Sequence, residues 1–327
     1  AAQQRPLTFM DMQRLNRGGS WTPSPDGAWL LYTVSTSDWE AAESQRDIHI
    51  VSLSEGVTSS RQLTFTDDKN ESQPTWGPDG SYFVFASNRD SDGAKNQLYL
   101  MRHDGGEARK FTDEEHGVSD FSFSPDGSWL VYRGGDDGEE QLHRMPVSDL
   151  FGTDPQQITA AQAGVEDWDW SPDGGTVYFV RPDAFDENEK LRREEGFTVD
   201  VKNAVTPLSS LWSVDVASAS EHRLTDDSSF SVDAFVVSDD GRWLSFTGGS
   251  TERYDRNITS ARLYSDQYLM DVATGDVERL TNNYEVSERA TRFSPDGRWI
   301  AFSAPDDLER YSMTENRIYI REVESRG

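Results

Sequence analysis

Two acidic residues, Asp167 and Asp169, alternate with two tryptophans in the stretch Glu-Asp-Trp-Asp-Trp that ends at residue 170. The alternation of side chains along a strand would place both carboxyl groups on one face and both indoles on the other. Paired carboxylates carry out acid–base chemistry in glycosidases. Because acidic residues are abundant in this chain, two interpretations stay open. The pair is either structural, bonding to nearby turns, or it lines a channel and contacts a ligand.

Other catalytic patterns are missing from the sequence. It contains no cysteine, no Gly-x-Ser-x-Gly nucleophile elbow and no His-Glu-x-x-His motif. None of the five histidines has a partner at metal-ligand spacing, and the loop at residues 66–68 does not match a calcium loop. We therefore expect no catalytic residue, no metal site and no cofactor in this chain.

The composition limits the classes of partner. The net charge is −28, with 59 acidic residues against 31 basic ones. Nucleic acids and anionic membranes require a positive patch, so we expect neither as a partner. No apolar run approaches the 18 residues of a membrane span, so no membrane insertion is expected. The start, Ala-Ala-Gln-Gln-Arg-Pro, resembles the end left by signal-peptide cleavage, which favours a periplasmic or extracellular protein; a cloning boundary is the alternative.

One twelve-residue phrase occurs six times, and its third copy reads FSFSPDGSWLVY at residues 121–132. The glycines that close the turn in each copy are Gly27, Gly80, Gly127, Gly174, Gly241 and Gly297, at spacings of 53, 47, 47, 67 and 56 residues. A period near 50 residues indicates a repeat architecture.

Each repeat carries further strand patterns. A basic or polar residue, an apolar residue and then a threonine recur at RQLT, RKFT, QQIT, HRLT and ERLT, each with its threonine 15 or 16 residues before the next phrase glycine. A third apolar segment, such as residues 97–103, lies between the phrase and this signature. Each repeat is therefore predicted to form four short strands.

The phrase itself predicts a hairpin with a type I turn, because Pro sets the first turn position and Gly accepts the left-handed one. The fifth copy, residues 238–241, lacks the proline, and we expect the same hairpin there. The strand after the turn is apolar at nearly every residue, which predicts cover on both faces. Four-stranded antiparallel units covered on both faces are typical of a β-propeller, here with about six visible blades.

The domain boundaries follow from what does not repeat. Residues 1–18 are predicted to be an N-terminal segment with a short helix at 9–16, and residues 19–327 the propeller. The sixth repeat ends after its third strand. Either Arg5–Thr8, which resembles the threonine signature, supplies the fourth strand, or the chain is cut from a seven- or eight-bladed parent.

Residues 182–209 lengthen the fourth repeat. Asp186 and Glu189 have the spacing of a helix capping box, and Gly196 is suited to end the helix. An extended segment is expected at 197–201.

The phrase and the threonine signature together resemble the repeats of TolB-like propellers and those of the N-terminal domain of prolyl oligopeptidase-family serine peptidases. Residues 7–12 leading to the first phrase, and residues 190–201, are similar to the dipeptidyl and acylaminoacyl peptidases of the latter family. The resemblance covers nearly the whole chain.

The peptidase resemblance implies a C-terminal α/β-hydrolase domain with a Ser-Asp-His triad, absent from these 327 residues. The propeller would then cap the active site and filter or bind peptide substrates. Dipeptidyl peptidases hold the substrate amine with a Glu pair on a propeller insertion, and Glu194 and Glu195 are such a pair by composition; a solvated helix face is the alternative. A stand-alone TolB-like scaffold that binds a partner protein is the second functional hypothesis, and a propeller glycosidase is the third.

Overall fold

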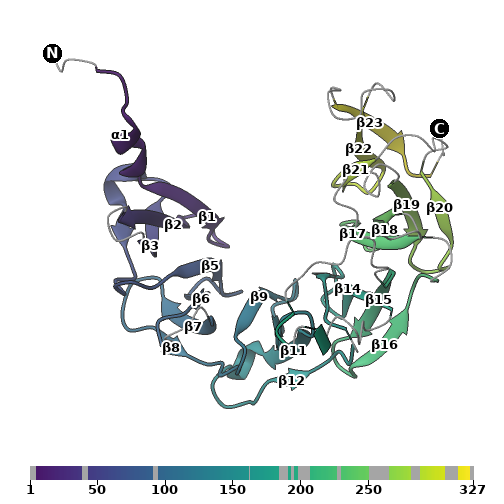
Figure 1. The fold of residues 1–327 in the computed structure, drawn as a ribbon, viewed down its shortest axis with the longest axis horizontal. Helices are drawn as coiled ribbons and strands as arrows, with labels where there is room; N and C mark the ends of the chain where they lie inside the picture. Colours follow the sequence, from purple (N-terminus) through teal and green to yellow (C-terminus); the bar gives the residue numbers. More distant parts are fainter. Residues whose placement is uncertain are drawn as a thin grey trace. The chain divides into compact units, whose positions relative to one another are not determined.

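The computed structural model describes residues 5–38, 43–90, 95–161, 163–183, 191–192, 195–197, 207–226, 230–249, 265–280, 288–305 and 316–324. The described residues form six antiparallel sheets, five of four strands and one of three, in which the strands follow chain order (Figure 1). The fold is therefore all-β and built as a propeller of about six blades, as the repeats predict. We number the sheets as blades one to six along the chain.

The strand bounds match one repeat to one blade. Blade one contains β1 (Arg17–Pro23), β2 (Trp29–Asp38), β3 (Glu43–Ser52) and β4 (Arg61–Gln62); blade two β5 (Glu71–Trp76), β6 (Tyr82–Ser87), β7 (Gln97–Arg102) and β8 (Arg109–Lys110); blade three β9 (Val118–Phe123), β10 (Trp129–Gly134), β11 (Gln141–Pro146) and β12 (Gln156–Gln157); blade four β13 (Asp167–Trp170), β14 (Thr176–Pro182), β15 (Ser209–Asp215) and β16 (Ser220–Arg223); blade five β17 (Ser231–Val237), β18 (Trp243–Gly249), β19 (Asp266–Asp271) and β20 (Val277–Arg279); and blade six β21 (Arg289–Phe293), β22 (Trp299–Pro305) and β23 (Asn316–Glu322). Two 3-10 turns lie at Gly56–Ser59 and Val147–Asp149.

The chain forms two compact units. The first contains residues 1–123, 127–136 and 143–156, and the second contains residues 124–126, 137–142 and 157–327. Blades one and two belong to the first unit, and blades four to six belong to the second.

The recurring turn is held by its serine and aspartate. In five repeats the Ser hydroxyl donates to the Asp Oδ1 two residues on, at 2.5–2.6 Å; the pairs are Ser24–Asp26, Ser124–Asp126, Ser171–Asp173, Ser238–Asp240 and Ser294–Asp296. This hydrogen bond lowers the pKa of Asp26, Asp173, Asp240 and Asp296, which we call the turn aspartates. The copy without proline keeps the turn, with Gly241 at φ +70°, so the predicted hairpin is confirmed.

Blade two has glycine in place of that serine for a steric reason. A Cβ on Gly77 would lie 2.4 Å from the ring of Tyr82, which covers the turn. Burial raises the pKa of the Tyr82 phenol to about 12. The aromatic ring therefore replaces the serine hydroxyl as the group that packs on this turn.

The last aromatic residue of each phrase forms a cross-strand pair with the third strand. Strand register pairs Tyr32 with His49, Phe85 with Tyr99, Phe179 with Trp212, Phe246 with Tyr268, and Phe302 with Tyr319. Tyr132 stacks on His143 at 5.1 Å between ring centroids in the same way in blade three. Such pairs stabilise adjacent strands beyond the area they bury. In β6 the neighbouring residues Phe83 and Val84, whose side chains point to opposite faces of the sheet, are both fully buried. This confirms that the strand is covered on both faces.

The threonine signature has a structural explanation. Thr112 is buried, with 2% of its surface exposed. Its hydroxyl accepts the backbone N–H of Leu98 at 2.8 Å and donates to Gln97 Oε1 at 2.9 Å. Thr64, Thr159 and Thr225 accept the equivalent third-strand N–H at 2.9–3.0 Å. The threonine thus satisfies a backbone donor just beyond the short fourth strand, where the ladder has ended.

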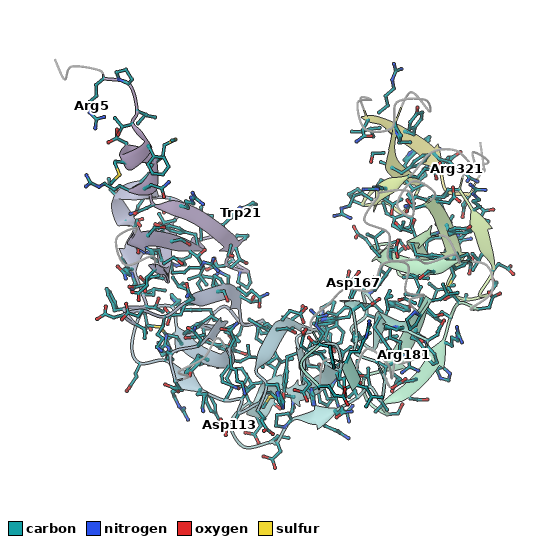
Figure 2. The ribbon with its side chains drawn as sticks, in the orientation of Figure 1. Arg5, Trp21, Asp113, Asp167, Arg181 and Arg321 are labelled. Atoms are coloured by element: carbon teal, nitrogen blue, oxygen red, sulfur yellow. The ribbon has the colours of Figure 1, made fainter. Side chains whose placement is uncertain are left out.

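At the N-terminus the helix α1 (Phe9–Gln13) is capped by Thr8, whose hydroxyl accepts the Asp11 N–H at 3.2 Å. Arg5, labelled in Figure 2, pairs with the Asp11 carboxylate. In the described part of the chain residues 5–8 belong to no strand, and blade six has three strands. Closure of blade six by residues 5–8 stays a prediction.

Candidate functional site

Asp167 and Asp169 lie on β13, the edge strand of blade four, next to β14; Asp167 is labelled in Figure 2. Each carboxylate accepts the backbone N–H of the following tryptophan, Asp167 from Trp168 at 3.0 Å and Asp169 from Trp170 at 2.8 Å. The Ser171 N–H bonds to Thr176 across the hairpin, so the alternate N–H groups of 168 and 170 point to the free edge. The aspartates therefore satisfy edge donors, which is the structural role that the sequence left open.

The two aspartates share one face of β13. The ring centroids of Trp168 and Trp170 lie 6.5 Å apart, so the two indoles share one face of the strand. The carboxylates then lie on the opposite face, as alternation predicted. Asp169 is opposite Tyr178, a buried residue that packs against blade five in the second unit. Burial raises the pKa of the Asp169 carboxyl, and the Trp170 N–H partly offsets this. Whether this pair also contacts a ligand stays a prediction.

A cluster of charged residues lies on β14, β15 and β16 of the same blade, where β14 leads into the insertion. Arg181 stacks on Trp212 with its guanidinium carbon 3.7 Å from the ring centroid and pairs with Glu221 at 2.9 Å. Glu221 also accepts the backbone N–H of Ala160 at 2.6 Å. Both charged side chains are less than one-fifth exposed, so the pair is held in a largely desolvated place.

A second pair completes this cluster. Arg223 pairs with Asp183 at 2.9 Å and donates to the Ser210 hydroxyl at 2.7 Å, and that hydroxyl donates to Asp183 at 2.8 Å. Asp183 and Ser210 flank the insertion, since one follows β14 and the other lies in β15. The Trp212 Nε1 is buried and has no hydrogen-bond partner among the residues that the structure describes. The cluster therefore fixes the two ends from which the insertion leaves the blade.

Sequence reasoning did not find this cluster. Its charged partners lie 40 residues apart in the case of Arg181 and Glu221, and nothing local in the sequence pairs them. The signal that could have pointed to this cluster is the basic residue of the threonine signature, which is Arg223 in blade four.

The insertion supplies Glu195, whose side chain is exposed. Its N–H donates to the carbonyl of Leu191 at 3.0 Å, and the Phe197 N–H donates to that of Arg192 at 2.8 Å. Gly196 has φ +75°, so it ends the helical turn as predicted. Glu194, Asp186, Glu189 and residues 198–201 lie outside the described residues.

In the described ranges no three His, Asp or Glu side chains lie close enough together to hold a metal ion. In the same part of the chain, no helix is both long enough and apolar enough to cross a membrane.

Comparisons with known proteins agree with this architecture. Over 97 residues the chain is 37% identical to a Bacillus subtilis protein named "Uncharacterized peptidase YuxL", a match that covers 29% of this chain and only 14% of that relative. The propeller domain of the trilobed protease from Pyrococcus furiosus superposes with a TM-score of 0.55 at 12% identity, covering 93% of this chain and 83% of that one. An oligogalacturonate lyase from Vibrio parahaemolyticus gives a TM-score of 0.55 at 16% identity, with 91% and 71% covered.

These structural likenesses, at such low identity, establish the fold alone, since one propeller fold carries both peptidase and lyase relatives. The model of the TolB beta propeller domain, PD40, matches residues 10–181, more than half of the chain. This span contains all but the first residue of α1 and the first three complete blades, whose turns and threonines carry the repeat. On this evidence the chain belongs to the TolB beta propeller domain (PD40) family.

Proposed function

We propose that this chain is the non-catalytic propeller domain of a secreted serine peptidase, in which it caps an α/β-hydrolase domain and admits or binds peptide substrates. The observation that carries the proposal is the 37% identity to a relative named as a peptidase. The match spans 14% of that relative, so most of the relative lies beyond it. The protease propeller among the solved structures has the same fold.

Blade four is the part of the chain that we assign to the substrate. The charged cluster of Arg181, Glu221, Asp183 and Arg223 holds the two ends of the insertion, so it positions the segment that carries Glu195. Asp169 adds a carboxylate on a free strand edge. Carboxylates suit the protonated amino terminus of a peptide, and we assign Asp167, Asp169, Glu194 and Glu195 as candidates for that contact.

The first test is the reading frame from which this chain comes. We expect it to continue past Gly327 and to encode a Gly-x-Ser-x-Gly motif within an α/β-hydrolase domain. The full-length product should hydrolyse peptide anilides, and the 327-residue chain alone should not. A frame that stops at Gly327, or turnover by this chain, would disprove the proposal.

The second test asks whether blade four contacts the substrate. In the full-length enzyme Asp169→Asn keeps an oxygen acceptor for the Trp170 N–H and removes the charge. We expect KM to rise for peptides with a free amino terminus and to stay constant for N-acetylated ones. The control is Asp113→Asn, because Asp113 is exposed and pairs with Lys110 of blade two. Equal effects on both substrates would refute the amine contact.

A TolB-like scaffold that binds a partner protein is the second candidate, favoured by the family model over residues 10–181. It predicts a reading frame without a hydrolase domain, so the first test separates the two functions. We further propose a periplasmic or extracellular location, which fractionation of the source cells would test.

A further inference from the structure

A pocket of about 520 Å³ lies in the second unit, between blade five and the end of blade six. Trp243 at the start of β18, Leu269 in β19 and Val277 in β20 form its apolar wall, and Val323 after β23 contributes from blade six. Its volume is within the range of pockets that bind small ligands. The pocket is separate from the aspartates of β13 and from the charged cluster of blade four.

The polar side of the pocket is strongly acidic. Four carboxylates line it, from Asp271, Asp276, Glu278 and Glu324, and the one cationic residue among the lining residues is Arg242. Apolar walls beside several carboxylates suit a ligand with an aliphatic stem and a cationic end. The wall chemistry therefore disfavours anions.

Arg242 shows how a guanidinium fits on this wall. Its guanidinium carbon lies 4.7 Å from the Trp243 ring centroid, its Nη1 bonds Glu324 at 2.5 Å, and its Nε lies 3.7 Å from Asp271. An aromatic face combined with carboxylates is the setting that arginine prefers. The side chain of Arg242 is half exposed, and Val277 in the same pocket is 39% exposed, so apolar surface is accessible there to a ligand.

Asp276 supplies a carboxylate without a side-chain partner in the described part of the chain. The turn around it is fixed by its own backbone, because its carbonyl accepts the Asp271 N–H at 3.0 Å and its N–H donates to Thr274 at 3.2 Å. Its side chain makes no hydrogen bond or ion pair with the described part of the chain. Glu278 differs, since Arg321 donates to it at 3.3 Å. Among the carboxylates that line the pocket, Asp276 is thus the one to which the described part of the chain supplies no side-chain partner.

We infer that this pocket binds the basic side chain of a peptide, an arginine or a lysine. The stem lies against Val277 and Trp243, and the cationic end pairs with Asp276. This inference does not depend on the peptidase proposal, because it requires only a peptide with an accessible basic residue.

Calorimetry on the 327-residue chain tests the site with two probes, acetyl-leucyl-arginine amide and its citrulline analogue, which has nearly the same shape without the charge. We expect the arginine probe to bind and the citrulline probe to bind at least about fivefold more weakly, the loss of roughly one charge-assisted contact. Asp276→Asn should weaken the arginine probe by a similar factor. Val277→Lys, which puts a tethered amine at the pocket, should abolish binding.

The control for general electrostatic attraction is Glu107→Gln, which removes the same charge from an exposed position in the first unit. It should leave the affinity within about twofold of the wild type, since a distant exposed charge is screened. Thermal unfolding of each variant checks that it is folded. No binding of the arginine probe, equal binding of both probes, or equal weakening by Glu107→Gln and Asp276→Asn would overturn the inference.

Discussion

The threonine that follows each fourth strand offers the sharpest test of how the repeat is stabilised. Thr112→Val keeps the shape of the side chain and removes the hydroxyl. The Leu98 N–H, which the hydroxyl accepts at 2.8 Å, is then left without a partner at a fully buried residue. Gln97 Oε1 loses one donor but keeps the Glu114 N–H at 2.9 Å. The penalty therefore falls on one buried donor.

The magnitude follows from that single donor. A buried, unsatisfied backbone N–H costs about 1–3 kcal/mol, and the added methyl group offsets a few tenths of this. We expect Thr112→Val to lower the free energy of unfolding by about 2 kcal/mol. Thr112→Ser keeps the hydroxyl and removes a methyl group, so it should cost about 1 kcal/mol or less. The exposed Thr58→Val should change it by less than about 0.5 kcal/mol.

The assay is urea unfolding followed by far-UV circular dichroism, combined with hydrogen exchange at the Leu98 amide. The valine variant should lower the urea midpoint and the protection of Leu98 more than the serine variant does. If valine is tolerated as well as serine, or better, the threonine is selected for strand propensity and not for its hydrogen bond. That result would refute the reasoning.

Three further predictions concern the turns and the charged cluster. Gly127→Ala should lower the free energy of unfolding by about 2 kcal/mol and Gly138→Ala by about 1 kcal/mol, both measured by urea unfolding. Both glycines have positive φ, but only at Gly127 would an added Cβ meet a neighbour, at 2.8 Å. Equal costs would contradict the steric argument. The pKa of the turn aspartates is lowered in the folded protein, so the stability that they contribute is present above their ordinary pKa and is lost as pH falls through the folded value. The free energy of unfolding should therefore decrease below about pH 4. A constant urea midpoint between pH 5 and 3 would argue against this. Arg181→Met should destabilise by about 2 kcal/mol, since it strands a largely buried carboxylate, whereas Arg102→Met, in an exposed pair, should cost less than about 0.5 kcal/mol; similar midpoints for both would contradict this.

Much of the fold was predictable because its determinants are local. The Ser-x-Asp-Gly turn closes within a few residues through the hydroxyl–carboxylate bond, so each copy specifies its own hairpin even where proline is absent, as at Ser238–Gly241. The apolar run after the turn predicted a strand buried on both faces, and Phe83 and Val84 are fully buried. The same locality explains why Gly196 was identified as a helix end.

The candidate site was predictable only in part. Alternation placed Asp167 and Asp169 on one face, but their bonds to the free edge follow from which N–H groups the hairpin already uses. Residues 5–8 were one of two alternatives for completing blade six, and the structure shows only that Thr8 and Asp11, three residues apart, form a capping box for α1.

The sequence by itself determined the repeat, its turns and the number of strands in each blade, since these depend on contacts within a dozen residues. Only the tertiary structure decided which distant side chains meet. The last aromatic residue of the phrase pairs with the third strand, Arg181 pairs with Glu221 40 residues away, and Asp276 and Trp243 line the same pocket. Such contacts depend on strand register and on the packing of one sheet against the next, and neither is encoded in the spacing of any single segment.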